Sequence, residues 1–199
     1  MSVLPSSGGV SVVQEYTLVT NNPPNPLTAP ILGPSKPGNL LVAVIAQNLG
    51  VAPAPAGWDL WKSAGNISIY QRRATGTAED AFPIETSGSG STLFGWLAEL
   101  SGSSLTAEAG PDLTAFASSS GGSIPQIELR APSIVVVAFD GTVNAYGPVW
   151  PKQEGGVVTG RDAGLFVSPL ISPTGHPQAF GFVFGSSGPP TTTAVFAIS

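Results

Sequence analysis

The chain lacks cysteine altogether and contains a single histidine, His176. The absence of cysteine excludes disulfides, thiolate metal sites and a thiol nucleophile. A serine hydrolase needs a histidine base held against its nucleophile. His176 lies in a turn-rich stretch, residues 172–177, and the chain has no Gly-x-Ser-x-Gly motif. We therefore expect no catalytic residue, no metal and no cofactor.

Charged residues are also scarce. They make up 10% of the chain, against roughly 25% in an ordinary soluble domain, and the net charge is −5. Seven scattered Lys and Arg in an acidic chain do not form the basic patch that binds nucleic acid. A surface of Ser, Thr, Gly and Pro is poorly protected against association. We expect neighbouring proteins to cover it; a monomeric secreted domain is the alternative.

Long hydrophobic runs are missing too. The longest apolar run, residues 40–46, is far shorter than the ~20 residues of a membrane-spanning helix. Residues 1–10 have neither the basic start nor the apolar stretch of a signal peptide. We expect no membrane insertion and no export by the ordinary route.

Glycine and proline, in contrast, are abundant, with 25 and 20 copies, and they cluster between apolar runs. Such punctuation is typical of short strands joined by turns. Residues 40–46 and 134–139 are continuous apolar runs, which favours strands buried on both faces. Residues 67–72 alternate like a strand buried on one face. Only residues 106–118 could hold a helical turn or two, limited by Gly110-Pro111.

The order of features repeats along the chain. A buried strand, a Pro/Gly loop with Trp, an alternating strand and a final apolar strand occur in residues 10–102 and again in 124–199, joined by a Ser/Gly-rich connection, 103–123. We interpret residues 1–199 as one all-β domain with almost no helix. Two similar four-strand halves would pack as an antiparallel two-sheet sandwich of jelly-roll or Greek-key type. The alternative is that such echoes arise by chance in any all-β chain.

Aromatic residues offer either core packing or a ligand platform. Trp96 lies inside an apolar strand and is expected in the core, while Trp58 and Trp150 follow Pro/Gly loops and are expected to plug the ends of the sandwich. An exposed aromatic could contact a ligand such as a sugar. The candidates for this surface contact are Trp61, Tyr70 and Tyr146.

Acidic residues are mostly isolated in the sequence and supply no metal-ligand spacing. The isolated ones are Asp59, Asp112, Asp140 and Asp162. Glu79-Asp80 follows Arg72-Arg73 closely, and cross-strand charge pairing at a sheet surface accounts for that arrangement. A glycosidase pair of carboxylates stays open, because any two acids can meet in space.

Four short motifs follow one another in the first half. They are Gly38-Asn39-Leu40-Leu41-Val42-Ala43-Val44, Pro55-Ala56-Gly57-Trp58, Ile69-Tyr70-Gln71-Arg72 and Trp96-Leu97-Ala98-Glu99-Leu100-Ser101-Gly102. This order resembles a recurrent domain of tailed-phage virion proteins, the minor tail or capsid-associated proteins. The resemblance covers residues 38–102 and implies a β-sandwich incorporated into a virion, with no catalytic residues. The Ala/Gly/Pro-rich composition is similar to that of proteins from phages of actinobacteria.

Three hypotheses for function follow. The first is a structural virion component, a minor tail, tail-tip or capsid decoration protein, assembled in the host cytoplasm. Its partners would be other virion proteins and copies of itself, with a trimer implied by resemblance to virion appendages. The second is a carbohydrate-binding module at the host surface, using the exposed aromatics. The third, a polysaccharide-cleaving enzyme, needs a carboxylate pair about 5–9.5 Å apart in a cleft.

Overall fold

The computed structural model of the chain is built from β-strands, which confirms the all-β prediction. It describes residues 9–21, 27–29, 33–47, 53–77, 80–84, 92–102, 113–120, 125–140, 145–150, 156–159, 163–173, 175–179, 181–184 and 192–199. Over these ranges there is no α-helix, and so none with the length and apolar character needed to cross a bilayer.

The first half of the chain forms one five-stranded antiparallel sheet, called sheet 1. Its strand order is β1-β7-β3-β5-β4, and every neighbouring pair is antiparallel. The bounds are β1 (Ser11–Asn21), β3 (Leu40–Gln47), β4 (Asp59–Ala64), β5 (Ile67–Arg73) and β7 (Thr92–Ser101). Numbered by their place in the chain, the five strands lie in the order 1-5-2-4-3.

The second half forms sheet 2 with the same order. Its strands run β8-β16-β10-β13-β12, which is again 1-5-2-4-3 by place in the chain. The bounds are β8 (Leu113–Ser120), β10 (Ser133–Asp140), β12 (Gly156–Thr159), β13 (Ala163–Ile171) and β16 (Thr192–Ile198). Even the register agrees: Leu40 pairs with Leu100 in sheet 1, and Ile134 pairs with Ile198 in sheet 2. The chain therefore consists of two similar halves.

The architecture differs from the sequence prediction in three details. Each half contributes five strands to its sheet, where four were expected. The additional strand of sheet 2, β8, lies within the connection 103–123 and is extended over residues 113–118, where the sequence allowed a helical turn. The jelly-roll form is not confirmed, because each sheet comes from one continuous half of the chain instead of from strands that alternate between sheets.

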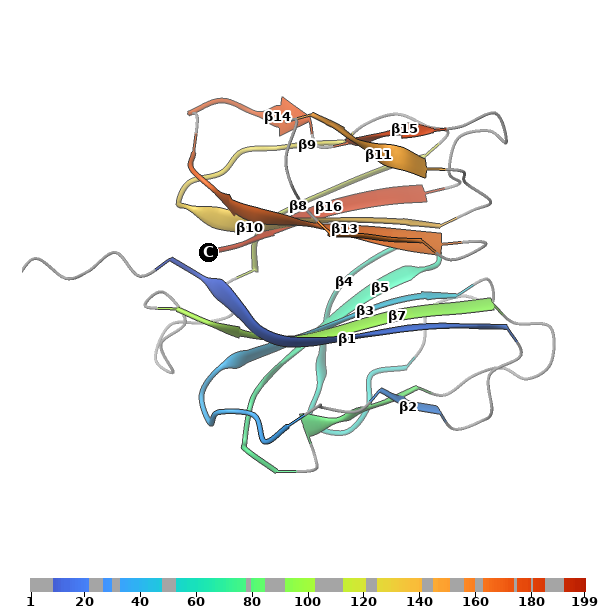
Figure 1. Cartoon of the computed structure of the whole chain (residues 1–199), viewed down its shortest axis with the longest axis vertical. Helices are drawn as coiled ribbons and strands as arrows, with labels where there is room; N and C mark the ends of the chain where they lie inside the picture. The colour runs from blue at the N-terminus through green and yellow to red at the C-terminus, as the bar shows by residue number, and fades with distance from the viewer. Residues whose placement is uncertain are drawn as a thin grey trace, which may run out of the picture.

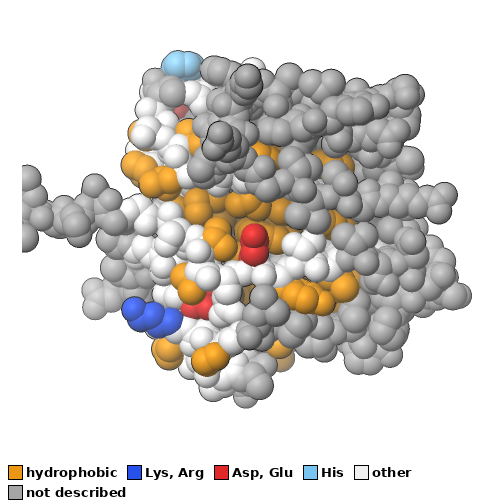
Figure 2. All heavy atoms as spheres, viewed as in Figure 1, with side chains coloured by type: hydrophobic (Ala, Val, Ile, Leu, Met, Phe, Trp, Pro, Cys, Tyr) orange, Lys and Arg blue, Asp and Glu red, His pale blue; other side chains and the backbone are white. Residues whose placement is uncertain are grey.

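The core between the two sheets comes from alternate residues of the central strands. Leu40, Val42 and Val44 of β3 face Ile134 and Val136 of β10 across this core. Side chains of a strand alternate between its two faces, so one set of residues fills the space between the sheets. Figure 2 shows hydrophobic side chains gathered across the middle of the molecule, along the seam between the sheets.

Smaller ribbons cover the outer faces, so the molecule is layered (Figure 1). The ribbon of β2 (Leu27–Ala29) and β6 (Phe82–Ile84) lies on sheet 1, where Leu41 and Ile45 pack against Phe82 and Ile84. On sheet 2 lie the pairs β9 (Gln126–Ile127) with β14 (Gln178–Ala179), and β11 (Ala145–Trp150) with β15 (Gly181–Phe184). These layers explain why β3 and β10 are buried on both faces, as predicted.

A turn of sheet 1 joins the two sheets at one end. The turn between β4 and β5 places the backbone N–H of Asn66 against the Asp140 carboxylate of β10, at 3.3 Å. The other oxygen of Asp140 accepts the N–H of Thr192 on β16, at 2.8 Å. Gly65, with a φ of 54°, has no room for a side chain, because a Cβ there would collide with Thr192 Oγ1. The turn is therefore seated directly on sheet 2.

We predict that Gly65→Ala destabilises the protein more than Gly175→Ala. Both glycines have positive φ, so each substitution costs about 1–2 kcal/mol of backbone strain. Only the Cβ at position 65 meets another residue, because position 175 has nothing within 4 Å. Overpacking should add about 1–3 kcal/mol for Gly65→Ala. Chemical denaturation measures the difference, and equal losses would contradict the seating of this turn on sheet 2.

Candidate functional site

The structure places Trp61, the first candidate for ligand contact, at the joint between the sheets. Its ring packs edge-on against Phe116 of β8, with centroids 5.7 Å apart, and against Phe196 of β16, at 6.0 Å. Trp61 is only partly buried, but these contacts belong to the shared core. Its ring therefore contributes to the contact between the sheets while part of the residue stays exposed, and its role in ligand contact stays a prediction.

Tyr70, the second candidate, is not on the surface at all. Its side chain is 0% exposed and lies on the outer face of sheet 1 beneath the ribbon, 5.0 Å from the ring of Phe82. Burial raises the pKa of Tyr70 above its usual value of 10.0, with a smaller opposing effect from Ser68. Tyr146, the third candidate, lies in β11, and its side chain is outside the described residues.

Of the predictions for the remaining tryptophans and the histidine, the structure confirms Trp96 in the core and His176 in an exposed loop. Trp96 lies in the core between the sheets and donates its indole N–H to Glu15 Oε2, at 2.8 Å. Trp58 is buried against Phe82 on the outer face of sheet 1. The side chain of Trp150 is outside the described residues, and His176 is exposed in its loop. Within the described ranges, no three His, Asp or Glu side chains gather as metal ligands.

Two charged residues of the four motifs, Arg72 and Glu99, lie at one end of sheet 1, which we call the polar end. It contains two buried carboxylates, Asp80 and Glu99, together with Arg72. Three loops lie over it: residues 33–39, residues 53–58 and residues 74–77. The polar end is the candidate functional site, because it is where the motif residues fix the position of surface loops.

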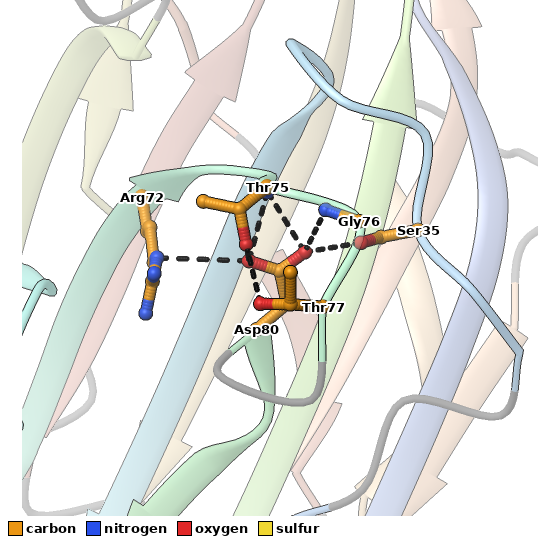
Figure 3. A network of polar contacts seen from close by, with 6 residues as sticks. All are labelled: Ser35, Arg72, Thr75, Gly76, Thr77 and Asp80. Atoms are coloured by element: carbon orange, nitrogen blue, oxygen red, sulfur yellow. Dashed lines mark hydrogen bonds and ion pairs between the residues drawn. The ribbon is translucent and has the colours of Figure 1, made fainter.

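Asp80 is fully buried and binds two of these loops (Figure 3). Its carboxylate accepts the N–H groups of Thr75 at 2.9 Å and Gly76 at 2.8 Å, and the Thr75 hydroxyl at 2.9 Å. The hydroxyl of Ser35 donates to it from the loop 33–39. Arg72 Nε lies 3.6 Å away on the opposite side. The expected charge pairing is present, but it lies beneath loops and not at a sheet surface.

These contacts decide the charge state of Asp80. Burial alone raises the pKa of a carboxyl group, because it disfavours the ionised form. Here the hydrogen bonds from Ser35, Thr75 and Gly76 outweigh burial and hold the pKa of Asp80 below its ordinary 3.8. The ionised carboxylate is therefore part of the folded structure.

Glu99 plays a similar role on the other side of the loop 33–39. It is 2% exposed, and its Oε1 accepts the Lys36 N–H at 2.7 Å and the Asn39 side-chain amide at 2.6 Å. Gln14 of β1 donates to Oε2 and also accepts the Gly33 N–H at 3.1 Å. Ser35 and Lys36 are adjacent, so the two buried acids hold one loop from both sides.

The third loop, residues 53–58, is positioned by the close approach of its glycine to Arg72. Gly57 has a φ of 79°, and a Cβ there would lie 3.1 Å from Arg72 Nη1. The Trp58 N–H closes the turn on Pro55 O at 3.0 Å, and its ring packs beneath. The motif glycine therefore lets the loop 53–58 lie directly on the guanidinium group that pairs with Asp80.

The second half has no equivalent of this arrangement at the Glu99 position. Glu99 pairs with Leu41, and the corresponding pair in sheet 2 is Val135 with Ala197. Ala197 is buried in an apolar cluster. The polar end is thus a specific feature of the first half and not a requirement of the shared strand order.

Sequence reasoning did not single out Glu99 or the burial of Asp80. A signal existed for Glu99, because it is the one charged residue within the apolar run of β7, and an ion inside a buried strand needs partners. Asp80 gave a weaker signal, its closeness in sequence to Arg72. All the hydrogen bonds described for these two carboxylates come from groups of the chain itself. The carboxylates therefore hold backbone N–H groups of the loops in place.

Comparisons of the chain with protein-family models, curated proteins and solved structures find no match.

We predict that the stability of the protein falls in acid because of Asp80. Its pKa is lower in the folded chain than in the unfolded chain, so the stabilisation is complete above about pH 5 and is lost as pH falls through the folded pKa. Asp80→Asn should cost about 3 kcal/mol near neutral pH and flatten the acid part of the profile. The free energy of unfolding as a function of pH measures this effect.

The matched control is Asp59→Asn, an exposed acid on the neighbouring strand β4. This variant should keep the wild-type acid profile. An unchanged profile in Asp80→Asn would show that the buried network does not stabilise the fold.

We also predict separate effects of the two acids on the amide groups they bind. Glu99→Ala should speed hydrogen exchange at the Lys36 amide by at least about tenfold, since a hydrogen bond to a charged group is worth about 1.5–3 kcal/mol. Asp80→Asn should instead affect the Thr75 and Gly76 amides most. Residue-resolved exchange measures both, and the same exchange pattern in the two variants would contradict this division.

Proposed function

We propose that the chain is a non-enzymatic structural component of a phage virion, a minor tail, tail-tip or capsid decoration protein, which acts by packing against other proteins. The observation that carries the proposal is the inward orientation of the charged residues at the polar end. Asp80, Glu99 and Arg72 hold the loops of the polar end, and their contacts are internal. Motifs whose role is to fix loops suit a protein that displays a rigid surface.

The loops at the polar end present a surface suited to protein contact. Pro34, Pro37, Pro53, Ala54 and Ala56 are exposed or nearly so, and they are uncharged and small or rigid. Little side-chain entropy is lost when such residues are covered. In the described parts of the three loops, Lys36 is the one charged side chain. This surface can be buried at low cost, as packing in an assembly requires.

The carbohydrate-binding alternative has less support. It depended on exposed aromatics, and Trp61 and Tyr70 are both engaged in packing within the fold. A glycan platform needs a free aromatic face. Tyr70 is fully buried and Trp61 is partly buried, whereas the side chain of Tyr146 lies outside the described residues.

The test is co-expression of the chain with its neighbouring structural genes, followed by gradient sedimentation. We expect the chain to sediment with assembled particles. Lys36→Glu places an acid in the middle of the proposed contact surface and should reduce incorporation severalfold without loss of stability. Lys62→Glu makes the same change on the exposed face of β4 and is the matched control.

Failure of the wild-type chain to enter any particle fraction would contradict the virion role. Equal incorporation of Lys36→Glu and Lys62→Glu would show that the contact surface lies elsewhere than the polar end.

A further inference from the structure

The two sheets end in four edge strands, and three of them carry features that discourage pairing with another chain. An unpaired edge is a template for added strands, and charges, bulges and short length protect it. Edge strand β1 has the exposed acid Glu15 and a bulge at Val12–Gln14, and β4 has Asp59, Lys62 and a bulge of its own. The remaining sheet 2 edge, β12, spans only four residues.

The fourth edge strand, β8, is longer than β12 and carries no charged residue, and the one such feature that it shares with β1 is a bulge near its start. Its sequence over Leu113–Ser120 is Leu-Thr-Ala-Phe-Ala-Ser-Ser-Ser, without charge or proline. It pairs with β16 in continuous register from Ser120 to Ala115, with an irregularity only at its start. Within the described part of the chain no second strand pairs with it.

Because the two sheets share one strand order, edge strand β8 of sheet 2 can be compared with edge strand β1 of sheet 1. By its pairing, Phe116 of β8 corresponds to Glu15 of β1, because their partners Phe196 and Ala98 occupy equivalent positions. The first half therefore has an acid where the second half has an aromatic ring. That ring packs against Trp61, which fixes β8 from the inner side of the sandwich. The edge of β8 is thus uncharged and held in place.

We propose that β8 pairs antiparallel with β8 of a second copy of this chain, joining the two copies of sheet 2 into one continuous ten-stranded sheet. Antiparallel pairing of identical strands generates a two-fold axis, so one contact closes the dimer. Each residue then lies opposite the residue equally far from the axis on the other strand, so a charge near the middle of β8 would lie near its like in the partner and be repelled by it. In a chain of net charge −5, the uncharged strand β8 is the edge suited to self-pairing.

The dimensions of the strand fit this contact. Eight residues extend about 27 Å, enough for a ladder of backbone hydrogen bonds. Ala115, Ala117 and Ser118 are small and let a second strand approach closely. The proposed partner of the β8 edge is a second copy of the chain. The pairing of β8 does not depend on the virion role, which specifies neither this surface nor this partner.

The test compares charged variants of Ser118, an exposed residue of β8. Sedimentation equilibrium of the full chain over a range of concentrations should show a monomer–dimer equilibrium. Ser118→Lys and Ser118→Glu should each weaken the dimer by about tenfold or more, because each places two like charges in the paired strands. Mixing the two variants should restore association as a heterodimer.

The matched control is Ser63→Lys, the same change at an exposed serine of edge strand β4, which should leave the dimer unchanged. Thermal unfolding checks that every variant is folded. A wild-type chain that stays monomeric at all concentrations, or a dimer weakened equally by Ser63→Lys, would overturn the proposal. A dimer that never enters particles would contradict the virion role alone, whereas a monomer that enters particles would contradict only the pairing of β8.

Discussion

The apolar layer between the two five-stranded sheets is the interaction on which the other features depend. Leu40, Val42 and Val44 on one side and Ile134 and Val136 on the other form a core that neither half can bury alone. Because the same strands are apolar on both faces, the outer faces must be covered as well. The small ribbons, the long Pro/Gly loops and the position of Trp58 all follow from that second requirement.

Covering the outer face of sheet 1 brings loop backbone close to a buried surface, where unpaired N–H groups are costly. Asp80 and Glu99 solve this locally by accepting N–H groups of Thr75, Gly76 and Lys36. Buried ions are stable only with close partners, so the acids and the loops stabilise each other. Sheet 2 has an apolar residue, Ala197, at the position of Glu99, which shows that the shared strand order does not itself require the acid.

This division between the halves bears on the proposed function. The polar end holds loops whose exposed residues, apart from Lys36, are uncharged, whereas the second half has the uncharged edge strand β8. The low charge of the chain, the fixed loops and the uncharged edge strand β8 support the proposal that the protein works within an assembly. The two halves thus differ in what they present at the surface, while their sheets share one strand order.

The sequence by itself determined the all-β class, the two strands buried on both faces and the repeat of the strand order. Apolar periodicity and Pro/Gly punctuation are local signals, so they can be read along the chain. Only the tertiary structure decided that β8 completes sheet 2, that Trp61 and Tyr70 face inward, and that Asp80 and Glu99 hold a common loop. These features depend on contacts between residues far apart in the sequence. The local pattern around Trp61 or Tyr70 is the same whether the ring faces solvent or another sheet.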